Sequence, residues 1–140
     1  MSTSAQSPTP QPAQLTSAPM FKAGLGAVVI GTALYFVLNL FGGGDMLAPR
    51  FAVYAYITLA HLFFGVWLII VGRTLSRKLG FILGVTTFLA SLSWATWAVS
   101  AWEELLAGRA LPIINIAGLP GLVLTPLIIL VSLIAIAKRA

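Results

Sequence analysis

Long apolar segments separated by short polar ones make up the chain from about residue 21 onward. Four of them, about 23–41, 51–72, 79–102 and 117–137, contain no Asp, Glu, Lys or Arg. A helix of about 20 residues, at about 1.5 Å per residue, crosses a hydrocarbon core of about 30 Å. The pattern therefore predicts an all-α integral membrane protein, multi-pass, with four transmembrane helices.

The residues between these segments favour tight connections. Gly42–Asp45 is a flexible turn after the first span, and 73–78 is a short polar turn that makes spans two and three antiparallel neighbours. Span three meets no helix breaker until Gly108, so we expect it to extend beyond the bilayer. Pro120 and Pro126 predict an irregular first turn or a kink in span four. Together these features predict an antiparallel four-helix bundle.

The chain divides into two parts by composition. Residues 1–20 are rich in Ser, Pro and Gln and are expected to form a flexible N-terminal tail, because they contain too little apolar surface to offset the entropy of ordering. Residues 21–140 form the predicted four-helix transmembrane domain. The tail is either unstructured or an extended strap over a neighbouring subunit.

The charges are distributed unequally between the two predicted sides of the membrane. The side with both termini holds six positive residues and no acid: Lys22, Arg73, Arg77, Lys78, Lys138 and Arg139. The other side holds Arg50 and Arg109 with Asp45, Glu103 and Glu104. By the positive-inside rule, both termini are predicted to be cytoplasmic. The basic side also suits anionic lipid headgroups.

Composition narrows the classes of function. The 140 residues are 59% apolar and 8% charged, and after four spans little chain remains for a soluble catalytic domain. The net charge of +5 follows the membrane sides, so we expect no nucleic-acid partner. Cysteine is absent, which excludes disulfides and thiolate ligands. No catalytic motif can be assembled, so an enzyme is not expected.

Small residues recur at helical spacing in the spans and predict close helix packing. The residues assigned to this role are Ala23, Ala27, Gly31, Gly65, Gly80, Gly84 and Gly121. Span three also has a second edge of hydroxyl side chains at Thr86, Ser93, Thr96 and Ser100. That edge either contacts a partner outside the bundle, lines a path, or bonds its own helix backbone.

His61 is the only histidine, and it falls in the middle of span two. An ionisable residue at this depth is a candidate functional residue. It could be the axial ligand of a chlorophyll-type pigment or a haem, or could relay a proton. In the alternative interpretation it is structural and bonds a hydroxyl of Thr58, Tyr54 or Ser91.

Other polar and aromatic residues gather near the outer ends of the spans. Glu103 and Glu104 either bind a cation or form a solvated helix end with Arg50 and Arg109 as counter-charges. Trp102 and Tyr54 are expected in an interfacial aromatic belt. Trp94 and Trp97 lie deeper and could pack on a neighbouring helix or on a flat cofactor.

These features predict a non-catalytic accessory subunit of a larger membrane complex. Its partners would be the lipid bilayer and other integral membrane subunits. An energy-converting complex, in respiratory electron transport or photosynthesis, is favoured by the central histidine. The expected location is a bacterial inner (cytoplasmic) membrane or an energy-converting membrane derived from it. The alternatives are a small oligomeric channel or transporter, and a pigment- or haem-binding module built on His61.

Overall fold

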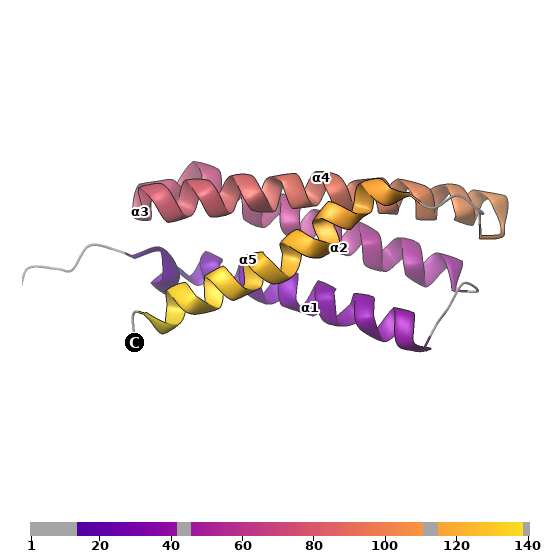
Figure 1. Ribbon diagram of the computed structural model, residues 1–140, viewed down its shortest axis with the longest axis horizontal. Helices are drawn as coiled ribbons and strands as arrows, with labels where there is room; N and C mark the ends of the chain where they lie inside the picture. Colours follow the sequence, from indigo (N-terminus) through magenta and orange to yellow (C-terminus); the bar gives the residue numbers. More distant parts are fainter. Residues whose placement is uncertain (1–13, 42–45, 111–114, 139–140) are drawn as a thin grey trace, which may run out of the picture.

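The described part of the computed structural model comprises residues 14–41, 46–110 and 115–138, and within these ranges it is all helical, with no strand. The four long helices are α1 (Pro19–Phe41), α2 (Leu47–Trp67), α4 (Arg77–Ala107) and α5 (Leu119–Ala137), shown in Figure 1. Short elements connect or extend them: η2 (Leu15–Ser17), the π-helical η4 (Leu68–Gly72), α3 (Arg73–Leu75) and η5 (Ile116–Gly118).

Four helical segments are long and apolar enough to cross a membrane, as the sequence predicts. They are Pro19–Phe41, Leu47–Leu75, Arg77–Ala107 and Ile116–Ala137, so three of them begin several residues before the predicted spans or end after them. These features are consistent with a multi-pass membrane protein. The predicted spans stop at or near charged residues, whereas the helices continue past Lys22, Arg50 and Glu103.

The third long helix ends where the sequence predicts. Gly108 adopts φ +70°, and its N–H donates to the carbonyl of Leu105. Only glycine takes this left-handed conformation without steric cost, so α4 stops after 31 residues, or about 46 Å at 1.5 Å per residue. In the last span a 3-10 turn precedes α5, Pro120 lies in its first turn, and Pro126 lies inside it.

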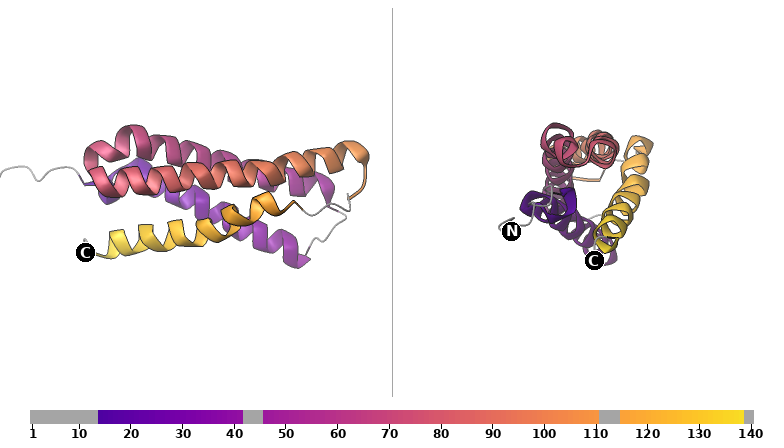
Figure 2. Two further views of the ribbon diagram at one scale, coloured as in Figure 1. Left: turned by 45° about the horizontal axis from the view of Figure 1, so that its top comes forward. Right: turned by 90° about the vertical axis from the view of Figure 1, so that its left-hand side faces the viewer.

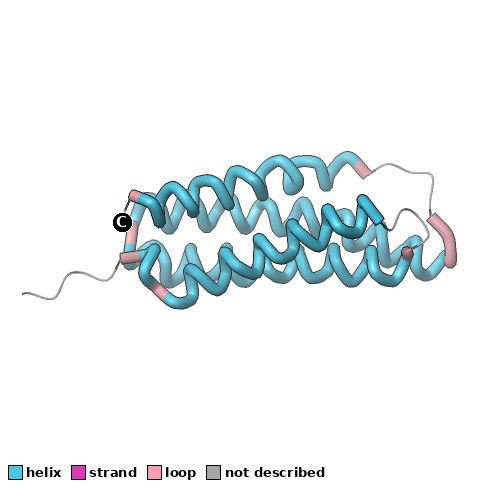
Figure 3. The backbone as a smooth tube through the Cα atoms, turned by 90° about the horizontal axis from the view of Figure 1, so that it is seen from below, coloured by secondary structure: helices cyan, strands magenta, loops and turns pink. Residues whose placement is uncertain are grey.

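The helices follow one another around the long axis in the order α1, α2, α4 and α5 (Figure 2). The most extensive contact joins α2 to α4, and α5 runs obliquely from α4 towards α1 (Figure 1). The backbone view from below shows the described connections as short segments at the two ends (Figure 3). α2 and α4 therefore form the central pair, and α1 and α5 leave most of their surface outside the bundle.

Glycines allow the close contact of α4 with α2 and with η4, which continues α2. A Cβ atom on Gly65 would lie 2.8 Å from the backbone nitrogen of Phe88, and one on Gly84 would lie 2.9 Å from the nitrogen of Ile69. A Cβ atom on Gly80 would lie 2.5 Å from the backbone carbonyl carbon of Gly72. Here backbone faces backbone, the arrangement that small residues permit between helices in lipid.

The other residues assigned to packing occupy different environments. Gly31 is buried against the side chains of Ile57 and Tyr56, and Ala27 is partly buried, its carbonyl accepting a 3.0 Å hydrogen bond from Tyr56 Oη. Ala23 is exposed and lines a shallow groove between α1 and α2. The buried face of α1 is instead carried by larger side chains, including Phe21.

The end of the predicted tail belongs to the bundle. The sequence places residues 1–20 in a flexible tail, but α1 begins at Pro19, and Leu15 and Thr16 are 2% and 6% exposed. The Leu15 side chain packs near Gly72, 3.2 Å from the position that a Cβ atom there would take. Residues 14–16 also line a cavity together with residues of α3, the start of α4 and the end of α5, so the turn lies against these elements. Residues 1–13 lie outside the described residues.

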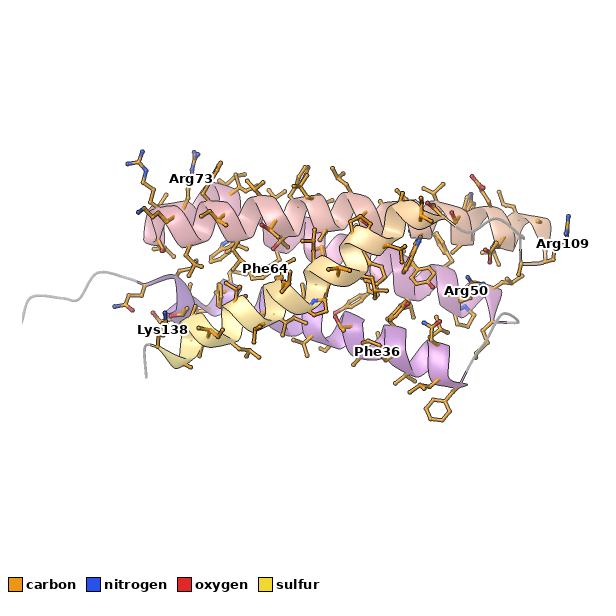
Figure 4. All side chains as sticks on the ribbon, in the orientation of Figure 1. Phe36, Arg50, Phe64, Arg73, Arg109 and Lys138 are labelled. Atoms are coloured by element: carbon orange, nitrogen blue, oxygen red, sulfur yellow. The ribbon has the colours of Figure 1, made fainter. Side chains whose placement is uncertain are left out.

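Charged side chains lie at the two ends of the molecule (Figure 4). Arg73 and Lys138 are at the end that holds the start of α1 and the end of α5, whereas Arg50 and Arg109 are at the opposite end. This separation is the one that the charge pattern predicts for the two sides of a membrane.

Candidate functional site

The buried polar centre of the bundle is His61 on α2. Its side chain is completely buried, and Ile57 one turn before it and Phe64 one turn after it are buried on the same face of the helix. An i, i+3, i+4, i+7 series of this kind places the imidazole inside the bundle rather than towards lipid.

Both imidazole nitrogens have protein partners. Nδ1 lies 2.8 Å from the carbonyl oxygen of Ile57, and Nε2 lies 2.9 Å from Thr125 Oγ1 on α5. A carbonyl oxygen only accepts, so Nδ1 carries the proton and donates it to Ile57. In the neutral ring, Nε2 is then an acceptor that faces the Thr125 hydroxyl. The partners thus select one tautomer.

Thr125 connects three helices through its hydroxyl. Trp94 Nε1 on α4 donates to Thr125 Oγ1 at 2.9 Å, while the same oxygen lies 2.8 Å from the carbonyl of Gly121. The hydroxyl proton therefore has two acceptors, His61 Nε2 and the Gly121 carbonyl. If His61 takes up a proton at Nε2, the hydroxyl can turn to Gly121 and every donor keeps an acceptor.

Aromatic rings surround one side of this network. The Trp94 ring centroid lies 6.3 Å from that of His61, 5.4 Å from Tyr35 and 5.4 Å from Trp97. Tyr54 completes the cluster and is only 7% exposed, so its ring packs inside the bundle, and its expected place in an interfacial belt stays a prediction. Trp102, 45% exposed at the end of α4, remains a candidate for that belt.

Ser93 and Ser100, on the hydroxyl edge of α4, form hydrogen bonds with residues at the start of the fourth span. Ser93 Oγ donates to the carbonyl of Ala117 at 2.6 Å and accepts from the N–H of Gly121 at 2.8 Å. Asn115 Nδ2 donates to the carbonyl of Thr96 and to Ser100 Oγ, and Asn115 Oδ1 caps η5 by accepting from the N–H of Ala117. Trp97 Nε1 donates to the carbonyl of Asn115 at 2.6 Å.

At the same end of the molecule, Arg50 near the start of α2 and Glu104 near the end of α4 form an ion pair. Arg50 Nη1 lies 2.8 Å from Glu104 Oε2, and Glu104 is 7% exposed, whereas Glu103 is exposed. Only part of the sequence interpretation therefore holds, because Glu104 is buried against its arginine rather than solvated. A cation would have to displace Arg50 to reach it.

A metal site needs several ligand side chains close together, and an axial cofactor ligand needs an available nitrogen. Within the described ranges, no three His, Cys, Asp or Glu side chains are grouped as metal ligands would be. An axial ligand needs one free imidazole nitrogen. Since Ile57 and Thr125 engage both, His61 could ligate a haem iron or a pigment magnesium only after one hydrogen bond is broken. The ligand role of His61 stays a prediction.

Sequence reasoning found the histidine but missed its partner. It named Thr58, Tyr54 and Ser91, yet Thr58 and Ser91 donate to backbone carbonyls of their own helices. Thr125 comes from the fourth span, whose distance from span two was not readable in the sequence. Its place on the small-residue face of span four, with Gly121 one turn earlier, was the available signal.

Comparison with protein-family models, curated proteins and solved structures finds no match to this chain.

Proposed function

We propose that this protein is a small non-catalytic integral membrane subunit of a larger membrane complex, with its helices antiparallel and both termini on the cytoplasmic side. The observation that carries the proposal is that the polar groups of the network around His61, at the centre of the bundle, have their hydrogen-bond partners within the chain. His61 and Trp94 both bond the Thr125 hydroxyl, and His61 and Thr125 also bond the backbone carbonyls of Ile57 and Gly121. A network so arranged joins α2, α4 and α5 and leaves their outer faces for lipid and neighbouring subunits.

The distribution of exposed apolar surface supports this role. Only 17% of the most apolar stretch of α1 is buried inside the chain, and only 22% of that of the last span. The corresponding fractions are 39% for the span that contains α2 and 44% for α4. In lipid such faces need no cover, but they provide two long surfaces on which partner helices can pack.

The experiment is purification of the native protein in mild detergent, followed by identification of bound polypeptides by mass spectrometry. The proposal predicts stoichiometric integral membrane partners, whose identity would also test the expectation of an energy-converting complex. Purification of the chain alone, in several mild detergents, would count against the subunit role.

The channel or transporter alternative depends on the hydroxyl edge of α4 lining a path. In the described structure Ser93 and Ser100 hold residues 115–121, and Thr96 donates to the carbonyl of Ser93. These bonds favour the structural interpretation. Solute flux into liposomes containing the purified protein alone would favour the transporter instead.

The pigment- or haem-binding alternative has a simple optical test. Because both nitrogens of His61 are bonded to protein, we expect the native preparation to be colourless. Visible absorbance that disappears in His61→Ala but persists in Thr58→Ala would establish the ligand role.

A further inference from the structure

A surface cavity of about 770 Å³ lies where the second span turns into the third. Its lining combines two kinds of side chain. Arg73, Arg77 and Lys78 are basic and exposed, and Phe81 and Ile82 are apolar, 50% and 63% exposed respectively. A site with cations at one end and apolar side chains one turn further along the helix has the polarity of a membrane phospholipid.

Among the residues that the structure describes, no acidic side chain lies beside these cations. The chain has three acidic residues, and Glu103 and Glu104 are at the far end of α4 from Arg77. The first turn of α4 contains no acid, and Ser76, at its N-cap, makes no side-chain capping bond. The first backbone N–H groups of a helix lack intrahelical acceptors and carry partial positive charge. Two cations in the first turn are therefore unfavourable unless an anion binds there.

The backbone brings these groups together. The π-helical η4 continues into the three-residue α3, which ends before Ser76. Ser76 is in an extended conformation (φ −150°, ψ 102°), and α4 starts at the next residue. Arg73 and Thr74 thus line the cavity from one side of the turn, and Arg77 and Lys78 line it from the other. π-Helical segments are frequent at functional sites.

We propose that this cavity binds the phosphate headgroup of an anionic phospholipid. Arg73, Arg77 and Lys78 would contact phosphate oxygens together with the free N–H groups of α4. Phe81 and Ile82 would contact the start of an acyl chain, and exposed Leu89, two turns further along α4, would extend that surface. Three cations favour a lipid with two phosphates over one with a single phosphate. The inference rests on the membrane insertion proposed above and not on the subunit role.

The test is lipid retention in nanodiscs of neutral phosphatidylcholine containing a small fraction of cardiolipin or phosphatidylglycerol, read by native mass spectrometry. We expect retention of cardiolipin above phosphatidylglycerol. Arg77→Gln/Lys78→Gln should weaken retention about tenfold or more, since each surface cation is worth about 1 kcal/mol towards anionic lipid. The matched control, Lys22→Gln/Lys138→Gln, removes two charges from the same end outside the cavity and should leave retention nearly unchanged.

Three results would overturn the inference. Equal loss of lipid retention in the two double variants would indicate general attraction to the basic end, and equal retention of neutral and anionic lipid would exclude a headgroup site. Displacement of the lipid by an equal concentration of inorganic diphosphate would indicate a site for a free phosphate compound. Arg73→Gln, a single exposed change, serves as a second variant if the double variant does not fold. A failed search for partner subunits would not alter any of these readouts.

Discussion

His61 Nε2 and Thr125 Oγ1 are 2.9 Å apart, although 64 residues separate them in the chain. This bond joins the second span to the fourth, and Trp94 joins the third span to the same hydroxyl. Side chains of three helices thus meet at one oxygen atom.

Loss of that hydroxyl should destabilise the bundle. Thr125→Val keeps the shape of the side chain but leaves His61 Nε2 and Trp94 Nε1 without their shared partner. Interhelical hydrogen bonds in membrane proteins contribute about 0.6 kcal/mol on average and up to about 1.7 kcal/mol, so we expect a loss of about 1–2 kcal/mol in the free energy of unfolding. Thr125→Ser should retain most of the stability. Denaturant titration in mixed micelles measures both, and equal stability of the two variants would contradict the role given to the hydroxyl.

The backbone contact at Gly80 should not accept a methyl group. In Gly80→Ala the added Cβ would meet the backbone of Gly72 and Arg73 at 2.5–2.6 Å, so the two segments must separate. Overpacking of this kind costs about 1–3 kcal/mol. Gly26→Ala is the control, since a Cβ there has nothing within 4 Å and alanine favours the helix. Thermal unfolding in detergent should show a lower midpoint for the first variant only.

The ion pair between Arg50 and Glu104 should contribute measurably because the carboxylate is buried. We expect Glu104→Gln to lower the free energy of unfolding by about 1–2 kcal/mol, between the values for exposed and fully buried pairs. Glu103→Gln removes the same charge from an exposed neighbour and should change little. A double-mutant cycle with Arg50→Gln isolates the pairwise energy. A coupling energy of zero would mean that the 2.8 Å contact does not stabilise the fold.

The turn before the first helix should matter for stability. Leu15 is 2% exposed, and Leu15→Ala removes a buried side chain, a change that costs about 2–5 kcal/mol in protein cores. We expect about 2 kcal/mol here, at the edge of the bundle. Met20→Ala, at a residue 53% exposed, is the control. Unaltered unfolding of the Leu15 variant would restore the sequence-based boundary of the tail at residue 20.

The sequence alone determined the elements that depend on local composition. A charge-free stretch of about 20 residues specifies a membrane-length helix wherever it lies, and Gly108 ends the third helix through its own backbone conformation. For the same reason the place of His61 within the second long helix was readable, because it follows from its position along one apolar segment.

Only the tertiary structure decided which side chains meet. Thr125 became the partner of His61, Glu104 rather than Glu103 became buried, and Leu15 joined the bundle. Each of these outcomes depends on the rotation and crossing of helices that are far apart in the chain. Helical spacing defines the faces of a single helix, whereas the choice of which face meets which neighbour follows from packing all of the helices together.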